Sequence, residues 1–250
     1  MRLDVYLVSN NLFDSREKAT FAIKSGGVTV NDKVVLKPST DVIDQIVKVV
    51  QEVNPFVSRG GFKLDHAIKS FELDFNNKIV LDIGASTGGF TDVALQNGAK
   101  KVVAVDVGSN QLHEKIKSNP KVESHENLNI LDYDTTEEFD YLVMDVSFVS
   151  IKSIIPNLLK FLNEENYLIA LIKPQYELGK VKIKNGVVKD KKIHLKVINE
   201  TINSIKELNL NVLNLIESPI TGKMGNKEYL ILVGKSNNYK SYNINEIVSK

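Results

Sequence analysis

The stretch Val80-Leu-Asp-Ile-Gly-Ala-Ser-Thr-Gly-Gly-Phe-Thr-Asp92 decides the fold of this 250-residue chain. Its apolar beginning is typical of a buried strand in a parallel sheet. Gly84 and Gly88 then allow a tight turn and a close approach of the backbone to a ligand. Residues 89–96 have the pattern of a helix, which Asn97-Gly98 ends. A strand, a glycine-rich turn and a helix in this order predict a site for a nucleotide-like cofactor.

The same alternation of strands and helices continues through the rest of the chain. Helices are predicted at 63–71, 111–117, 150–162 and 194–208, and strands at 78–83, 101–107, 140–145, 167–173, 211–217 and 227–233. Repeated strand–helix–strand units imply a mainly parallel sheet with helices on both faces. The sequence therefore predicts a doubly wound α/β domain from about residue 60 onward.

The first 60 residues have a different pattern, that of a small α+β unit. Ser15 is a candidate N-cap for a helix that Ser25-Gly26-Gly27 ends. Short strands are predicted at 28–30, 34–36 and 45–50, the first two around the turn Asn31-Asp32-Lys33. Asn54-Pro55 indicates a linker, because the residue before a proline is disfavoured in a helix. We expect a domain at 1–53, a linker at 54–59 and a second domain at 60–250.

Composition excludes several classes of protein. Cysteine is absent, which excludes disulfides, thiolate metal sites, iron–sulfur clusters and cysteine nucleophiles. The longest apolar stretches, such as 167–172, are far below the roughly 18 residues of a membrane helix. The N-terminus has no signal-peptide pattern, so we expect a cytoplasmic protein. The net charge of +1 does not by itself indicate a nucleic-acid-binding protein.

The distribution of basic residues is more informative than their number. The chain has only three arginines, Arg2, Arg16 and Arg59, and all lie in the first 60 residues, where a planar bidentate donor suits phosphate. Arg16, Lys18 and Lys24 lie on or next to one predicted helix and are candidates for phosphate contacts, although a solvated helix face has the same pattern. The lysine-rich segment 180–196 is either a second contact patch or a flexible surface loop.

Two carboxylates indicate which cofactor the glycine turn takes. Asp82 ends the first strand immediately before the turn, where a carboxylate would repel a pyrophosphate but would suit an ammonium group and a sulfonium. Asp106 ends the next strand, a position from which a carboxylate binds ribose hydroxyls. The pattern favours S-adenosylmethionine, although an ordinary turn whose glycines serve packing remains the alternative.

Further candidates follow from the topology. Asp145 and Lys173 end two predicted strands, Glu228 opens the last strand, and Lys63 opens the first helix. Ligands of open α/β sheets bind outside the carboxyl ends of the parallel strands, so Asp145 and Lys173 are expected at one edge. Each of the four side chains could instead form a structural salt bridge.

Several motifs together resemble a known family. Arg2-Leu-Asp-Val-Tyr-Leu-Val8, Ser15-Arg-Glu-Lys-Ala19 and Gly27-Val-Thr-Val-Asn31 are similar to the S4-like RNA-binding domain, first named from a small-subunit ribosomal protein. The remainder resembles FtsJ-type ribose methyltransferases. Together with Val57-Ser-Arg-Gly-Gly-Phe-Lys-Leu64 and Met144-Asp-Val-Ser-Phe148, these motifs resemble the TlyA / hemolysin A family of rRNA 2′-O-methyltransferases over about residues 1–235.

The resemblance implies a fold, a set of site residues and a partner. The implied fold is a Rossmann-like class I methyltransferase domain with a mainly parallel seven-stranded sheet, preceded by a small α+β S4-like domain. The implied catalytic set is Lys63, Asp145, Lys173 and Glu228. The implied contacts of S-adenosylmethionine are Asp82, Gly84, Ala85, Ser86, Thr87, Gly88, Gly89, Phe90 and Asp106, and the implied RNA contacts are Arg2, Arg16, Lys18, Lys24 and Arg59.

The implied substrate is ribosomal RNA, modified at a cytidine, and no metal or membrane is required. One departure from the family pattern is visible, because Asn127-Leu128-Asn129 stands where relatives carry Asn-x-Arg. In the expected mechanism, Lys173 takes the proton of the ribose hydroxyl or orients that hydroxyl, while Asp145 and Glu228 hold the two amines. The alternatives are a membrane-active hemolysin and a non-catalytic RNA-binding protein. The oligomeric state is left open.

Overall fold

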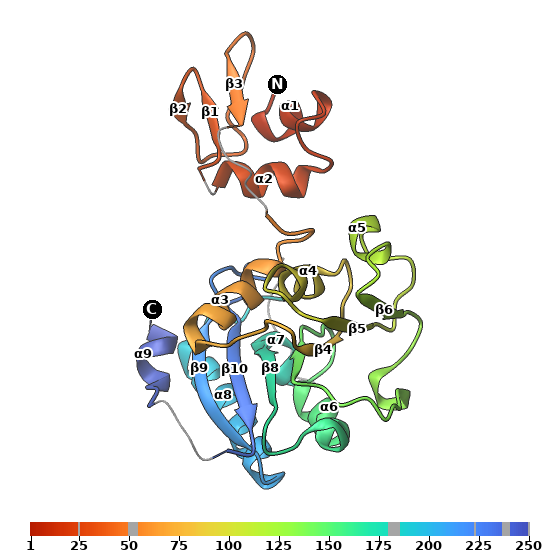
Figure 1. Ribbon diagram of the computed structural model, residues 1–250. Coiled ribbons are helices and arrows are strands. Elements are labelled where there is room, and N and C mark those ends of the chain that lie inside the picture. The colour runs from red at the N-terminus through yellow and green to blue at the C-terminus, as the bar shows by residue number, and fades with distance from the viewer. Residues whose placement is uncertain (25, 50–54, 180–185, 223, 237–240, 250) are drawn as a thin grey trace. The chain divides into compact units, whose positions relative to one another are not determined.

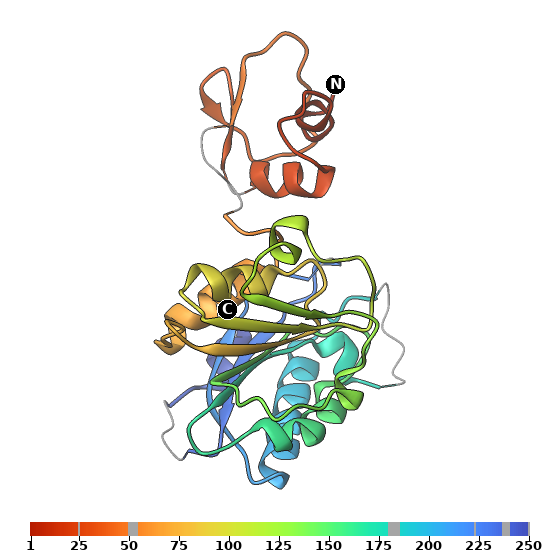
Figure 2. The same ribbon diagram turned by 45° about the vertical axis from the view of Figure 1, so that its right-hand side comes forward.

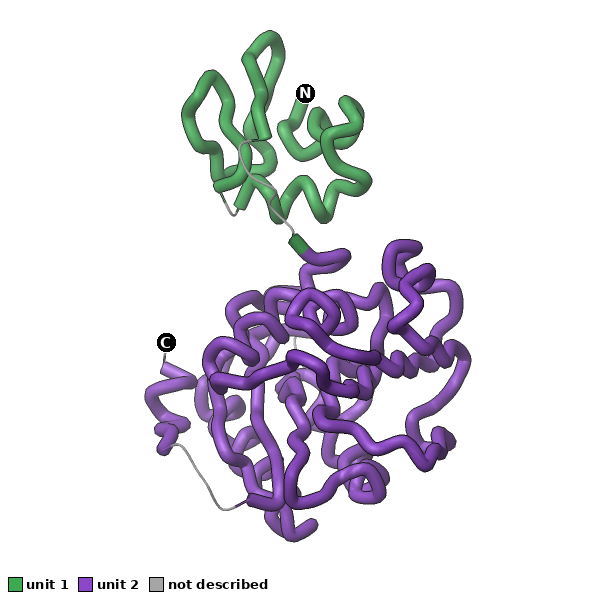
Figure 3. Tube along the Cα trace, viewed as in Figure 1, with its two compact units in different colours: residues 1–55 green, residues 56–250 purple. Residues whose placement is uncertain are grey.

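A computed structural model describes residues 1–24, 26–49, 55–179, 186–222, 224–236 and 241–249. The chain divides into two compact units, residues 1–55 and 56–250 (Figure 3). Some predicted features lie outside the described residues: Ser25 of the first helix stop, Val50 of the third strand, Asn54 of the linker, and Lys180, Lys182 and Lys184 of the basic segment.

The first unit packs two helices on a three-stranded antiparallel sheet. Its elements are α1 (Leu3–Ser9), α2 (Arg16–Lys24), β1 (Val28–Val30), β2 (Lys33–Val34) and β3 (Val47–Val49), with sheet order β2-β1-β3. As predicted, Ser15 caps α2, because its Oγ accepts a hydrogen bond from the amide of Lys18 at 3.3 Å. Leu3, Leu7 and Ile23 are fully buried in the core of this unit.

The second unit contains a seven-stranded sheet in the order β6-β5-β4-β7-β8-β10-β9 (Figure 1). The strands are β4 (Ile79–Ile83), β5 (Lys101–Val105), β6 (Val122–His125), β7 (Tyr141–Met144), β8 (Tyr167–Ile172), β9 (Asn211–Glu217) and β10 (Tyr229–Gly234). The neighbours from β6 to β8 pair in parallel, whereas β10 is antiparallel to both β8 and β9. This topology confirms the predicted mainly parallel, Rossmann-like sheet.

Helices cover both faces of the sheet, as Figure 2 shows. On one face α3 (Gly61–Phe71) and α4 (Gly89–Gln96) bury Leu64, Phe71 and Val93 against the strands. On the other face α6 (Ile151–Leu158), α8 (Lys191–Glu207) and α9 (Ile244–Ser249) bury residues such as Ile155 and Val197. The short elements α5 (Glu114–Lys117), α7 (Pro174–Glu177), η1 (Ile130–Asp132) and η2 (Leu159–Phe161) lie in the connections.

The structure corrects several predicted elements. Strand β6 was missed, because Val122-Glu-Ser-His125 lies at the sheet edge, half-buried or exposed, and has no apolar run. Helix α1 was missed because its N-cap, Arg2, makes no side-chain capping bond and gives no start signal. Residues 191–196 are not a loop: Asp190 caps α8 by accepting a hydrogen bond from the amide of Lys192 at 2.8 Å.

Other predicted elements have shorter bounds. Strand β5 ends at Val105 rather than at 107. The chain turns there because the carboxylate of Asp106 accepts a hydrogen bond from the amide of Gly108. The helix predicted at 111–117 is only the four-residue α5, which begins where His113 Nδ1 accepts the amide of Lys115. The helix predicted at 150–162 ends at Leu158 and continues as η2. The end of β5 and the start of α5 depend on local side-chain bonds that periodicity does not reveal.

Candidate active site

The sheet topology brings three of the predicted catalytic residues to one edge. Asp145 directly follows β7, and Lys173 directly follows its parallel neighbour β8. Glu228 precedes β10, whose first residue pairs with Ile172 at the end of β8. Because β10 is antiparallel to β8, its beginning lies beside the carboxyl end of β8. The three side chains therefore share the edge at which ligands of such sheets bind.

The fourth residue, Lys63, reaches this edge from the first turn of α3. The segment before α3 is fixed on α4, because the amide of Val57 donates to Asp92 Oδ2 at 2.8 Å and Asp92 is buried. A Cβ on Gly89 would lie 3.0 Å from the amide nitrogen of Gly61 and still closer to the Ser58 hydroxyl. The glycines thus allow the start of α3 to pack directly against the start of α4.

The four side chains form a continuous row of alternating charge. Lys173 Nζ lies 2.5 Å from Asp145 Oδ1, and Lys63 Nζ lies 3.1 Å from Asp145 Oδ2. Lys63 Nζ also lies 2.7 Å from Glu228 Oε2. None of these side chains is more than 18 % exposed. Two ammonium groups and two carboxylates balance each other, which compensates the cost of burying the charges.

The row sets the ionisation of its two central members. Burial disfavours the charged amine of Lys63, but Asp145 and Glu228 outweigh it and raise the pKa of Lys63. Burial also disfavours the carboxylate of Asp145, but Lys63 and Lys173 outweigh it and lower the pKa of Asp145. Lys63 therefore stays charged, since a carboxylate lies on either side of its amine.

Polar and aromatic groups surround Lys173. Its Nζ donates to the hydroxyl of Ser147 at 3.0 Å and lies 5.9 Å from the centre of the Tyr176 ring. The ring of Phe148 lies 5.2 Å from the Tyr176 ring and is almost completely exposed. The sequence interpretation gave no role to Ser147 or Tyr176, although Ser147 lies within the quoted motif Met144–Phe148.

The predicted cofactor turn begins directly after β4 and lies against Asp145 of the charged row. Gly84 and Gly88 have φ values of 79° and 88°, which favour glycine, and Ser86 has a φ of 48°. A Cβ on Gly84 would lie 3.1 Å from the backbone oxygen of Asp145. Asp106 fixes the turn, since its Oδ2 accepts a hydrogen bond from the amide of Ser86 at 2.7 Å. Its Oδ1 accepts a second hydrogen bond, from the amide of Gly108.

Asp82 lies beneath the turn and is 1 % exposed. Its Oδ2 accepts a hydrogen bond from the hydroxyl of Thr91 at 2.6 Å, whereas its Oδ1 has no hydrogen-bond partner among the described residues. Burial raises the pKa of Asp82 to about 7, and the hydroxyl of Thr91 opposes this rise only in part. A buried carboxylate oxygen without a partner fits a ligand that donates hydrogen bonds and carries positive charge.

The predicted RNA-binding residues occupy different environments. Arg2 and Arg16 both bind the carboxylate of Asp4 in the first unit. Lys18 pairs with Asp14 at 2.6 Å, and Lys24 is exposed at the end of α2. Arg59 belongs to the second unit, where it donates to the backbone oxygen of Thr221 at 3.0 Å.

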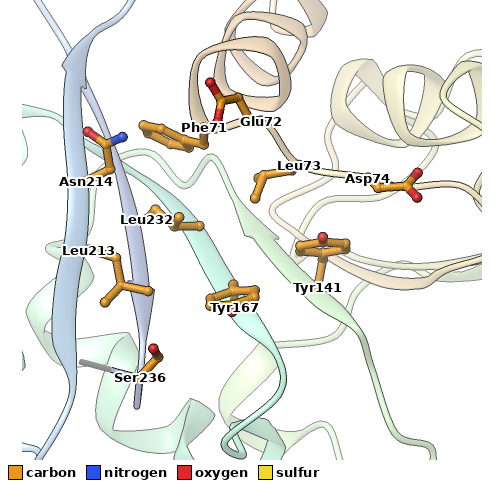
Figure 4. Close-up of a pocket in the computed structure, with 10 residues that line it drawn as sticks. All are labelled: Phe71, Glu72, Leu73, Asp74, Tyr141, Tyr167, Leu213, Asn214, Leu232 and Ser236. Atoms are coloured by element: carbon orange, nitrogen blue, oxygen red, sulfur yellow. The ribbon is translucent and has the colours of Figure 1, made fainter. Parts of the chain in front are cut away.

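A cavity of about 420 Å³ lies elsewhere in the second unit (Figure 4). Phe71 of α3, Tyr141 and Tyr167 are among its lining residues, and the two tyrosines are the first residues of β7 and β8. The cavity thus lies at the amino ends of these strands, opposite Asp145 and Lys173. Among the described residues, no cluster of acidic and histidine side chains is arranged to hold a metal ion, and no helix is long and apolar enough to span a membrane.

Comparison with known proteins assigns both parts of the chain. Residues 56–235 match the family model of FtsJ-like methyltransferases, and residues 1–42 match the model of the S4 domain. Hemolysin A of Brachyspira hyodysenteriae is 42 % identical over 236 residues, which cover 92 % of this chain and 98 % of that protein.

Two further relatives cover most of the chain. The 23S rRNA (cytidine-2′-O)-methyltransferase TlyA of Campylobacter jejuni is 35 % identical over 250 residues, which cover 92 % of this chain and 97 % of that protein. The solved structure of a candidate hemolysin from Streptococcus thermophilus has 38 % identity and a TM-score of 0.76. That match covers 100 % of this chain and 94 % of the other.

Proposed function

The chain belongs to the TlyA / hemolysin A family of FtsJ-like methyltransferases, as its sequence motifs predict, and we propose that it methylates a ribose 2′-hydroxyl of ribosomal RNA. The methyl donor in this proposal is S-adenosylmethionine. The observation that carries the proposal is the buried row Lys173–Asp145–Lys63–Glu228 beside the glycine turn. The related TlyA of Campylobacter jejuni is named for cytidine, so we propose cytidine as the target nucleoside.

The residues around the turn fit the proposed cofactor. Bound there, S-adenosylmethionine would supply an electrophilic methyl group on a sulfonium. The unpartnered Oδ1 of Asp82 would accept hydrogen bonds from the ammonium group of the cofactor. Each carboxylate oxygen of Asp106 accepts one backbone amide and has a further lone pair, which would accept a hydrogen bond from a ribose hydroxyl of the cofactor. The backbone of Gly84 to Phe90 would line the rest of the site.

The row of charges suits proton transfer from a hydroxyl. In the proposed mechanism, Lys173 first gives up one proton to solvent, and its neutral Nζ then accepts the proton of the ribose 2′-hydroxyl as that oxygen attacks the methyl group of the donor. Asp145 fixes this amine through Oδ1 and holds Lys63 through Oδ2. Lys63, kept charged between Asp145 and Glu228, stabilises the negative charge that develops on the attacking oxygen. The site would also hold the ribose hydroxyl in line with the methyl group of the donor, and this orientation supplies much of the remaining increase in the rate of methyl transfer.

The first unit would supply RNA affinity. Its S4 domain carries Arg2, Arg16, Lys18 and Lys24, and contacts of these side chains with phosphates would be salt-dependent and largely independent of sequence. We propose the same role for Arg59 in the second unit. In this proposal the first unit binds ribosomal RNA while the second unit performs the transfer.

Mapping ribose methylation in rRNA from cells with and without the gene tests the proposal. We expect a ribose-methylated cytidine that is lost with the gene and restored by the wild-type protein but not by Lys173→Met. Identical methylation maps would refute the proposal. A lysis assay with the wild-type protein and Lys173→Met tests the membrane-active alternative. Equal lysis by both proteins would support that alternative, because pore formation should not depend on the amine of Lys173.

A further inference from the structure

Two of the chain's three arginines converge on a single carboxylate in the first unit. Arg2 donates from Nε to Asp4 Oδ1 at 2.9 Å and from Nη2 to Asp4 Oδ2 at 3.0 Å. Arg16 donates from Nη2 to the same Oδ2 at 2.8 Å. Because the two guanidinium groups share one oxygen, they lie next to each other, although Arg2 precedes α1 and Arg16 begins α2.

The carboxylate is fixed more firmly than a surface ion pair requires. The Asp4 side chain is 3 % exposed, its Oδ1 also accepts the amide of Val5, and its own amide donates to the backbone oxygen of Pro38. The hydrogen bond from Arg2 is the main reason that the pKa of Asp4 lies well below its usual range, so the group is ionised at neutral pH. The arginine side chains, by contrast, are 49 % and 60 % exposed.

The remaining donors of the two guanidinium groups point to a ligand. Each guanidinium has five N–H groups, and the bonds to Asp4 use two on Arg2 and one on Arg16. Two adjacent planar cations with donors left over match the two non-bridging oxygens of a phosphodiester. Asp41 also acts on Arg2 and raises its pKa slightly further. Asp4 and Asp41 are thus the acidic groups that act on Arg2.

We propose that Arg2 and Arg16 form one preorganised clamp for an RNA phosphodiester and that Asp4 is its positioning residue. The inference rests on the proposed RNA-binding role of the first unit and adds to it a specific arrangement of donors. Held on Asp4, the two long side chains lose rotamer freedom during folding rather than during binding, which favours association. Asp4 therefore strengthens RNA binding even though its own charge repels RNA.

The proposal predicts that Asp4→Asn changes RNA affinity in the direction opposite to that expected from charge alone. Asp4→Asn removes a negative charge from an RNA-binding unit, so charge alone would tighten binding. If Asp4 acts through the two arginines, the same substitution weakens binding about tenfold, the loss of roughly one charge-assisted hydrogen bond. The matched control is Asp32→Asn. Asp32 pairs with Lys48 at 2.7 Å on the surface of the same unit, and the change in charge is identical.

The experiment measures the affinity of the full-length protein for a fluorescein-labelled hairpin of 23S rRNA sequence over a series of salt concentrations. We expect Asp4→Asn to weaken binding and to lower the salt slope by about one to two, whereas Asp32→Asn leaves both unchanged or tightens binding slightly. In an Arg16→Ala background, Asp4→Asn should weaken RNA binding much less than it does in the wild-type protein. Binding that tightens or stays unchanged in Asp4→Asn would overturn the clamp.

Two further measurements keep the test decisive. Affinity for S-adenosylhomocysteine monitors the second unit, and near-ultraviolet circular dichroism monitors the fold. If Asp4→Asn unfolds the first unit, Arg2→Lys and Arg16→Lys decide instead, because they keep the charge but lose the planar fork. Lysine variants that bind like the wild type would overturn the clamp. A wild-type protein without affinity for the hairpin would overturn the RNA-binding role itself, a result distinct from all of these.

Discussion

The buried carboxyl of Asp82 makes cofactor affinity depend on pH. Burial dominates its environment and raises its pKa to about 7, and the nearby Asp145 and Asp106 add to this rise. In the proposed site this carboxyl receives the ammonium group of the cofactor, which requires the ionised form. Below pH 7, therefore, the protein must release a proton from Asp82 before or as the ligand binds.

The expected size of the effect follows from linkage between binding and ionisation. A group with a pKa of about 7 is about nine-tenths ionised at pH 8 and about one-tenth ionised at pH 6. The apparent affinity for a cationic ligand should thus be about tenfold weaker at pH 6 than at pH 8. Since the raised pKa favours the neutral form, the direction is fixed: affinity rises with pH across this window.

Isothermal titration calorimetry with S-adenosylhomocysteine provides the assay, because this ligand keeps the ammonium group and transfers no methyl group. The wild type should show the tenfold change together with proton release at pH 6. Asp82→Asn, which keeps the shape and the bond to Thr91, should bind more weakly and with little pH dependence. A wild-type affinity that is the same at pH 6 and pH 8 would refute the assignment of Asp82 to the ammonium group.

Substitutions at three further positions test other parts of the site. Lys173→Met should reduce the single-turnover rate of methyl transfer by about a hundred- to ten-thousand-fold, and Lys173→Arg nearly as much, because a guanidinium cannot accept the proton. Asp106→Ala should weaken calorimetric binding of S-adenosylhomocysteine by about 1–3 kcal/mol, since the amide of Ser86 also loses its acceptor. Glu228→Gln should lower the rate more than cofactor affinity, because Lys63 loses one of its two carboxylate partners.

Each of these expectations has a result that contradicts it. An active Lys173→Arg enzyme would assign an electrostatic role to this position in place of proton transfer. Unchanged affinity in Asp106→Ala would remove this carboxylate from the cofactor site. An equal loss of affinity and rate in Glu228→Gln would indicate that Glu228 holds the fold of the site rather than the charge of Lys63.

Much of the second unit could be predicted because its buried strands are continuous apolar runs. Tyr167–Ile172 and Tyr141–Met144 are recognisable in the sequence for this reason, and their ends predict where Asp145 and Lys173 meet. Strand β6 could not be found in the same way, since an edge strand is paired on one side only and tolerates polar residues. Its place is set by pairing with β5.

The contacts within the site needed the structure. The sequence placed Lys63 at the start of a helix, but its bonds to two carboxylates depend on how α3 packs against α4. It placed Asp82 beside the glycine turn, but not its burial against Thr91. Asp4 had no predicted role at all, because its two partners lie at the starts of different helices.

Methyl transfer from labelled S-adenosylmethionine to ribosomal RNA tests the central proposal most directly. The purified protein is incubated with ribosomal subunits under single-turnover conditions, and the RNA is digested to nucleosides for mass spectrometry. The account predicts label in 2′-O-methylcytidine with the wild type and a loss of at least about a hundredfold in rate with Lys173→Met. Label on a nucleobase, no label in RNA, or an equally fast Lys173→Met enzyme would contradict it.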